Sequence, residues 1–225
     1  YNYYDVKNDQ FIMNISFEII NQYPPTYEII YKGHQEYFCS LFGHLHVDSK
    51  LHYFAFRLIT RVIESFPPGE FPDLIEECLN WEHLFQFFEY PDESKIKIML
   101  LFSSAYLRFG SSIFDMFENR IPIKGKLKDL FEIDEISFFD ILITMINNDE
   151  LPFTTQKVAV NLFINATLFS AKTQVLRLFQ KGVLPIFISF LENDSDEDVN
   201  IGIINSIKRI WEICQEASAE SEEIT

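Results

Sequence analysis

Residues 181–214 read KGVLPIFISFLENDSDEDVNIGIINSIKRIWEIC, and this stretch decides the fold class. A glycine and a proline open an apolar run over residues 183–191, an acidic turn follows, and apolar residues then recur every three to four positions. Proline is tolerated in the first turn of a helix, and acidic side chains favour a helix N-terminus. The pattern predicts a short helix, a turn and a long helix, with Trp211 buried against the helix at 183–191. The predicted buried stripe consists of Val199, Ile203, Ile207, Ile210, Trp211 and Cys214.

Long helical runs of this kind occur four times in the chain. They begin at Lys50, Lys95, Lys157 and Asp198, so their starts lie 45, 62 and 41 residues apart. Two of these spacings match the period of about 40–47 residues that HEAT and armadillo arrays show, and the long one contains an insertion at residues 118–130. No unit can bury its own apolar face, so the units are expected to stack. We expect about ten to twelve helices and essentially no sheet. The acidic turns predict N-caps at Asp92, Asp149 and Asp196.

The last unit resembles an armadillo repeat. In that family a glycine precedes a short helix with a Leu-Pro pair, and an acidic turn leads into a long third helix that carries an asparagine. Ile164-Asn165-Ala166 and Ile204-Asn205-Ser206, 40 residues apart, look like the same feature in successive repeats. The resemblance covers residues 152–215 and implies an all-α, right-handed α-solenoid; the earlier units resemble armadillo and HEAT repeats equally. The matching positions are Gly182, Leu184, Pro185, Phe190, Leu191, Val199 and Asn205.

Composition narrows the class of protein. Acidic residues outnumber basic ones by 34 to 18, giving a formal charge of −16, which disfavours binding to nucleic acid or an anionic membrane. The three cysteines are widely spaced and form no disulfide or zinc pattern, and no signal peptide is legible. We therefore expect a cytoplasmic protein, with the nucleus as a second compartment. One helical-repeat domain is expected over residues 1–215, followed by a disordered acidic tail at 216–225.

No motif in the sequence supports catalysis. The best candidate for a metal site is His44 with His46, near His34, His52 and Cys39, but the spacing matches no known zinc pattern, so turn histidines are expected. The acidic turn that begins at Asp194 starts like a calcium-binding loop but lacks the glycine and the final glutamate. We expect a protein that is not an enzyme and has no cofactor, metal or small-molecule substrate.

The leading hypothesis is a scaffold that binds an extended protein segment in a concave groove lined by the long helices. A regulatory subunit that clasps a kinase, phosphatase or chaperone is the alternative. An importin-type adaptor is disfavoured. That family has a tryptophan one turn before each asparagine, and Asn161 and Ile201 occupy those positions in this chain. The basic segment of the insertion, Arg120 to Lys128, is interpreted as a connecting loop or as a docking loop for an acidic partner or a phosphate group. The candidate partner-binding residues are Arg57, Arg61, Ser104, Arg108, Asn161, Asn165, Asn205, Arg209, Arg120, Lys124, Lys126 and Lys128.

Overall fold

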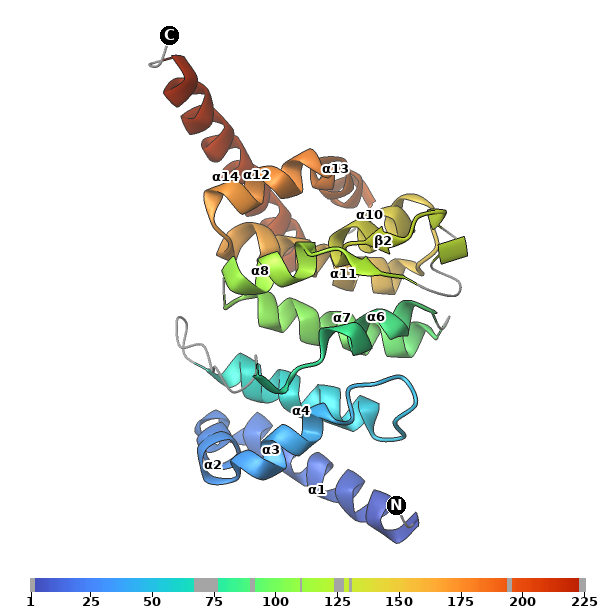
Figure 1. Cartoon of the computed structure of the whole chain (residues 1–225). Coiled ribbons are helices and arrows are strands. Elements are labelled where there is room, and N and C mark those ends of the chain that lie inside the picture. Colours follow the sequence, from blue (N-terminus) through green and yellow to red (C-terminus); the bar gives the residue numbers. More distant parts are fainter. Residues whose placement is uncertain are drawn as a thin grey trace. The chain divides into compact units, whose positions relative to one another are not determined.

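The computed structural model describes residues 3–66, 77–89, 92–109, 111–123, 128–129, 131–193 and 196–222, and most of them are helical (Figure 1). These ranges contain twelve α-helices and one short 3-10 helix, η1 (Pro24–Thr26). The all-α prediction is confirmed. The helices are α1 (Tyr3–Gln22), α2 (Tyr27–Gly33), α3 (Gln35–Phe42), α4 (His52–Ser65), α6 (Trp81–Glu89), α7 (Glu93–Leu107), α8 (Ser111–Glu118), α10 (Phe138–Asn147), α11 (Phe153–Phe169), α12 (Lys172–Gln180), α13 (Val183–Asn193) and α14 (Glu197–Glu222).

The chain divides into two compact units. Unit 1 comprises Tyr1–Tyr106 and Lys124–Phe131, and unit 2 comprises Leu107–Ile123 and Glu132–Thr225. In unit 1, α1 packs along α4, and α2 and α3 pack on each other and on α4. Its core is strongly aromatic: the ring of Phe56 on α4 lies 5.3 Å from Phe87 on α6 and 5.4 Å from Phe102 on α7. Edge-to-face rings fill such a core and fix the geometry between helices.

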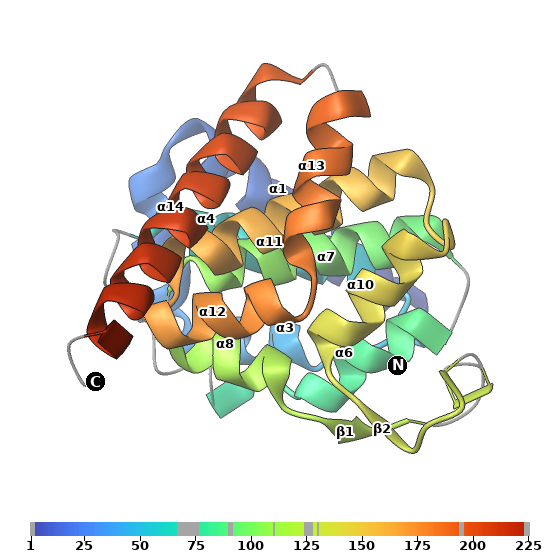
Figure 2. The same cartoon turned by 90° about the horizontal axis from the view of Figure 1, so that it is seen from above.

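Unit 2 is built around α11 and α14, which lie side by side, with α12 and α13 also packed on α14 (Figure 2). The helices α8 and α10 meet through stacked rings, because Phe117 lies 4.6 Å from Phe138 between centroids. Ser137 caps α10: its hydroxyl accepts from the backbone N–H of Asp140 at 3.2 Å. Pro185 falls in the first turn of α13, as predicted, where a missing N–H costs no helical hydrogen bond.

Two of the three predicted N-caps are confirmed. Asp92 Oδ1 accepts from the backbone N–H of Ser94 at 3.1 Å, and Asp196 Oδ1 accepts from that of Asp198 at 3.1 Å. The prediction for Asp149 is wrong, because Asp149 ends α10 in the left-handed region with φ +54°. Its N–H bonds to Ile146 O and the next N–H bonds to Met145 O, a Schellman arrangement in which aspartate replaces the usual glycine.

The insertion between α8 and α10 contains a small antiparallel ribbon. Strand β1 (Ile121–Pro122) pairs with β2 (Glu135–Ile136), and Ile121 lies opposite Ile136. This is the only sheet in the described part of the chain, in line with the expected near-absence of strands.

The predicted burial of Trp211 is wrong, because 64% of this residue is exposed. The buried stripe of α14 runs through Val199, Ile203, Ser206, Ile210 and Ile213 instead. The predicted stripe did not include Ser206. Its hydroxyl donates to Gly202 O at 2.9 Å, which lets a serine occupy a core position and turns Trp211 outward.

The last helix also runs further than expected. Residues 216–222 continue α14, where the sequence predicted a disordered tail, and Figure 1 shows this end projecting beyond α12 and α13. Lys172 of α12 pairs with Glu216 and connects this extension to the rest of unit 2.

Candidate partner-binding surface

The two long helices of unit 2 run parallel in a register that two contacts define. Lys157 Nζ donates to Asp196 Oδ2 at the start of the pair, and Arg209 Nη2 donates to Ser170 O at 2.7 Å at its far end. Both contacts join residues 39 positions apart. Each residue of α11 therefore lies level with the residue about 39 positions later on α14.

A glycine sets the distance between these helices. An ideal Cβ on Gly202 would lie 3.0 Å from Ile164 Cδ1 and 3.2 Å from its Cγ2. Ile164 is 6% exposed, so its side chain fills the space that a larger residue at 202 would need. The absence of a Cβ thus allows a closer approach of α11 and α14.

Three of the predicted asparagines lie along this helix pair. Asn161 and Asn165 are half-buried and follow one another at i and i+4 on α11, whereas Asn205 is exposed on α14. Helical geometry puts all three on the same side of the Ile164–Gly202 contact, with Asn205 nearly level with Asn165. The structure therefore brings together the amides that the sequence singled out 40 residues apart.

Two of the predicted basic residues each contact the C-terminal end of α11. Arg108 is exposed and its Cζ lies 6.0 Å from the centre of the Phe169 ring. Arg209 is half-buried and donates to the carbonyl of the next residue, Ser170. Cations are favoured where a helix leaves its last carbonyls unpaired. Sequence analysis proposed both arginines but missed Phe169, whose exposed ring lies at the same place.

Other predicted basic residues are engaged within unit 1. The guanidinium carbon of Arg57 lies 4.0 Å from the centre of the Phe17 ring on α1, a cation–π distance. Arg61 lies 3.5 Å from Glu64 in an i, i+3 ion pair. Arg57 thus joins α4 to α1, and Arg61 pairs within α4, so both cations are already engaged inside unit 1.

The remaining predicted residues divide between buried, exposed and undescribed positions. Ser104 is buried, with 8% exposed, so it presents little surface to a partner. Arg120 and Lys128 are exposed at the insertion. Lys124 and Lys126 lie outside the described residues.

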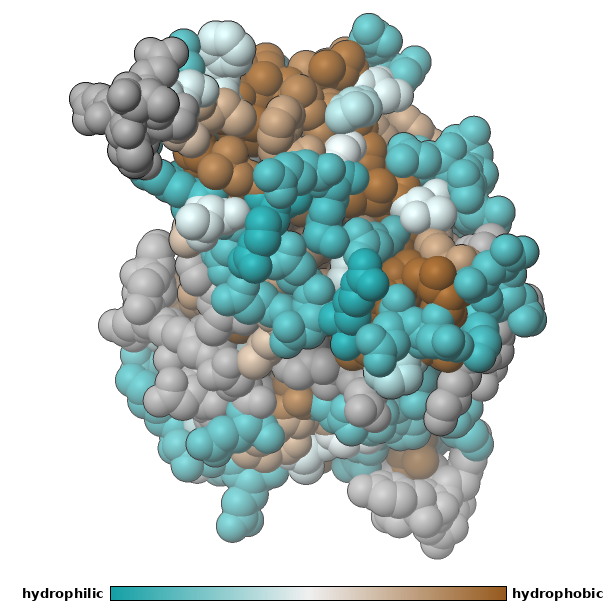
Figure 3. Space-filling view, turned by 45° about the horizontal axis from the view of Figure 1, so that its top comes forward, coloured by the Kyte–Doolittle hydropathy of each residue, from teal (hydrophilic) through white to brown (hydrophobic). Residues whose placement is uncertain are grey.

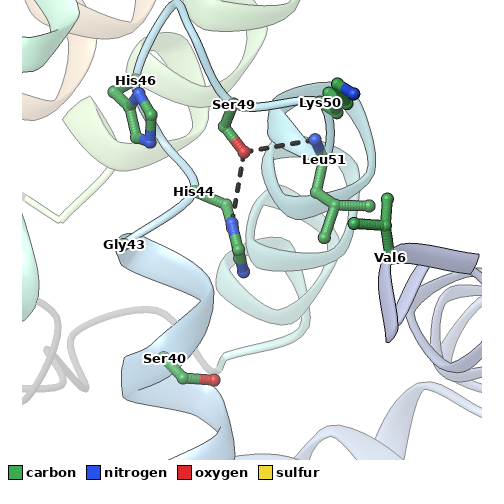
Figure 4. Close-up of a pocket in the computed structure, with 8 residues that line it drawn as sticks. All are labelled: Val6, Ser40, Gly43, His44, His46, Ser49, Lys50 and Leu51. Carbon is green, nitrogen blue, oxygen red and sulfur yellow. Dashed lines mark hydrogen bonds between the residues drawn. The ribbon is translucent and has the colours of Figure 1, made fainter. Parts of the chain in front are cut away.

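The histidines proposed as a possible metal site line an open pocket of about 430 Å³ in unit 1 (Figure 4). His44 Nδ1 lies 3.2 Å from Ser49 Oγ, which also accepts from the N–H of Leu51. The His46 imidazole instead lies 5.9 Å from the ring of His83, measured between centroids. Burial lowers the pKa of His44, so its ring is neutral at pH 7.

His44 has its partner in this turn, whereas His46 lies against His83 of α6. The described residues contain no group of three or more His, Cys, Asp or Glu placed to hold a metal ion. His52 makes a further contact in the turn, because its Nδ1 lies 2.6 Å from Ser49 O. The pocket is lined by Val6, Ser40, Gly43, His44, His46, Ser49, Lys50 and Leu51.

One cysteine pair is close enough to interact. Cys78 Sγ lies 2.9 Å from Cys39 Sγ, and both are free thiols. Burial and this hydrogen bond raise the pKa of Cys78 to about 12. The thiolate, which is the reactive form, is therefore scarce at neutral pH.

Among the described helices, none is both long and apolar enough to cross a membrane alone. The helices α12 and α13 reach that length and hydropathy only together, and they bend by 76° at their junction.

Comparisons with known proteins assign no function to this chain, so a function can be proposed only from its own residues. No protein-family model matches this chain. No curated protein matches it either.

Proposed function

We propose that the chain is a non-enzymatic scaffold of armadillo-like repeats that holds an extended segment of a partner protein on the asparagine side of α11 and α14. The observation that carries the proposal is the parallel register of these helices, which places Asn165 and Asn205 level with each other beside a close helix contact.

The order of helix lengths supports a repeat architecture. A short helix, a second short helix and a long helix follow one another as α2, α3 and α4, again as α8, α10 and α11, and again as α12, α13 and α14. The long helices α4, α7, α11 and α14 begin at residues 52, 93, 153 and 197, and the widest interval contains the β1–β2 insertion. Units of this kind stack and present their long helices as an extended surface.

The chemistry of asparagine suits a peptide backbone. Each side-chain amide offers both a donor and an acceptor, which match the N–H and C=O of one residue in an extended chain. Packed helices lie about 8–10 Å apart, and three residues of extended chain span about the same distance. A segment that crosses α11 and α14 would therefore meet Asn165 and Asn205 about three residues apart.

Charge contributes less to this proposal than the amides do. Lys157 is paired with Asp196, and Arg209 donates to Ser170 O, so these cations already have partners inside unit 2. Arg108 is exposed and lies beyond the asparagines at the end of α11, where it would contact an acidic residue at one end of a bound segment.

The test is a selection of peptides from a random phage library on the folded chain. Selected peptides should bind the double variant Asn165→Ala/Asn205→Ala about 5- to 150-fold more weakly, since each lost hydrogen bond contributes roughly 0.5–1.5 kcal/mol. Asn193→Ala is the matched control, because Asn193 is exposed at the end of α13 and its amide donates to Ser189 O of the same helix.

Two outcomes would contradict the proposal. Peptides that bind the double variant as tightly as the wild type would show that the asparagines are not the contact. A chain that selects no peptide, but binds a folded partner through its shorter helices, would be better described as a regulatory subunit.

A further inference from the structure

The first helix of unit 1 has two apolar sides. Met13 and Ile20 are buried where α1 packs along α4. On the opposite side Phe11, Ile15 and Ile19 recur every four residues and are exposed, Phe11 by 65%. They surround a depression of about 260 Å³ on the outer face of α1. We call this surface the α1 outer face; it is lined by Phe11, Asn14, Ile15, Glu18, Ile19 and Gln22.

The last helix of unit 2 shows the same arrangement. Its buried stripe faces its neighbours in unit 2, whereas Ile201, Ile204 and Trp211 lie on the opposite side and are each at least half exposed. We call these three residues with Lys208 the α14 outer face. Figure 3 shows hydrophobic residues gathered on the end of unit 2 where α13 and α14 lie. Ile188 on α13 is a further exposed isoleucine.

Exposed apolar surfaces of this kind mark interaction sites. The packing inside each unit indicates what covers them. In unit 1 the long helix α1 packs along the long helix α4, and in unit 2 α11 packs along α14. Each contact uses one side of each helix, so the outer faces of α1 and α14 are the sides that a further long helix would cover.

We propose that a second copy of this chain covers them, with the α14 outer face of one copy packed against the α1 outer face of the next. Shape favours this head-to-tail pairing, because Trp211 projects from one face and the other is hollowed. Charge favours it too. The α1 outer face carries Glu18, and the α14 outer face carries Lys208, whose Nζ also lies 3.8 Å from Glu212.

Pairing of like faces is disfavoured by the same features. Two α14 outer faces would oppose two tryptophans, whereas two α1 outer faces would oppose two hollows and two glutamates. A head-to-tail contact leaves one free face on each outer copy, so it extends to rings or chains of copies. The proposal goes beyond the peptide-binding function. Asn205 follows Ile201 by one helical turn, so the two surfaces adjoin on α14, and the α1 variant Ile15→Glu keeps the two tests distinct because it lies outside the peptide site.

The experiment is sedimentation velocity across micromolar concentrations of the full chain. The wild type should form species larger than a monomer in a concentration-dependent way. Ile15→Glu blocks the α1 outer face and Trp211→Glu blocks the α14 outer face, and each variant alone should remain monomeric. An equimolar mixture of the two should form a 1:1 dimer and nothing larger, because only one complementary pair of faces remains.

Matched controls separate this outcome from misfolding. Ile29→Glu changes an equally exposed isoleucine on α2, outside both faces, and should associate like the wild type. A second pair, Ile19→Lys and Ile204→Lys, should reproduce the behaviour of the first. Circular dichroism of each variant should match the wild type.

Three results would overturn the proposal. The first is a wild-type chain that stays monomeric throughout the concentration range. The second is a variant blocked on one face that still dimerises, which would show pairing of like faces. The third is an equimolar mixture of the two blocked variants that stays monomeric.

Discussion

Gly202→Ala tests the close approach of α11 and α14, on which the proposed peptide site depends. The new methyl group would lie 3.0 Å from Ile164 Cδ1, 3.2 Å from Cγ2 and 3.7 Å from Cγ1. Ile164 is β-branched and buried, so its side chain has little freedom to rotate away. The helices must therefore separate by a few tenths of an ångström or the isoleucine must leave its preferred rotamer.

Two opposing terms decide the effect on the free energy of unfolding. Alanine is favoured over glycine inside a helix by about 1 kcal/mol. Overpacking a filled contact costs about 1–3 kcal/mol. We expect a net destabilisation of about 1 kcal/mol, which lowers the melting temperature of a chain of this size by about 2–4 °C.

Two other glycines provide controls with different expected signs. Gly33 ends α2, and a Cβ there would meet nothing closer than Ile29 Cγ2 at 4.0 Å, so Gly33→Ala should be neutral or stabilising by up to about 1 kcal/mol. Gly182 has φ +95° with no atom within 4 Å of a built Cβ. Gly182→Ala should therefore destabilise by about 1–2 kcal/mol through backbone strain alone.

The assay is equilibrium urea unfolding of the single variants and of a double-mutant cycle with Ile164→Ala. In the Ile164→Ala background the clashing atoms are gone, so Gly202→Ala should become stabilising by about 1 kcal/mol. If Gly202→Ala stabilises the wild-type chain as much as the Ile164→Ala chain, the helices do not approach closely. The close helix contact beside Asn165 and Asn205 would then be absent, and the proposed peptide site would lose that part of its support.

Three further predictions follow from single contacts. Trp211→Ala should change the free energy of unfolding by less than about 1 kcal/mol in dilute solution, because a mostly exposed side chain loses little packing; a loss above about 3 kcal/mol would restore the buried assignment. Diamide should oxidise Cys39 and Cys78 to an intramolecular disulfide while being reduced to the hydrazine, and peptide mapping of a Cys214→Ser chain would detect this disulfide. Alkylation of Cys78 at pH 7 should be slow, because the pKa of its thiol is about 12. The pKa values of Asp92 and Asp196 are lowered, chiefly by side-chain hydrogen bonds from Ser94 and Lys157 respectively. The ionised carboxylates therefore stabilise the folded chain above the unfolded-state pKa near 4, and this stabilisation is lost as the pH falls through the lower folded-state pKa. Alanine variants of either aspartate should therefore melt below the wild type at pH 7, and this difference should shrink at pH 2; a constant difference would contradict the capping assignment.

Part of the candidate site was visible in the sequence. The recurrence of Ile164-Asn165-Ala166 and Ile204-Asn205-Ser206 at a spacing of 40 predicted that the two asparagines occupy equivalent positions, and the contacts 39 residues apart place them level. Which cations remain available to a partner was not visible in the sequence in the same way. Sequence patterns show which residues are cationic but not which aromatic ring or carbonyl each cation reaches, and Arg57 and Arg209 both have such partners.

The sequence by itself determined the all-α class, the positions of the long helices and the capping role of Asp92 and Asp196. These features depend on local rules, because apolar periodicity, proline in a first turn and a short acceptor before a helix act within a few residues. Tertiary structure decided which side of each helix is buried. Ser206, whose hydroxyl donates to a carbonyl of its own helix, lies in the core where Trp211 was expected. Asp149 follows the end of a helix, where the start of one was expected. Such choices depend on the neighbours that each residue meets across the fold, which the local pattern does not contain.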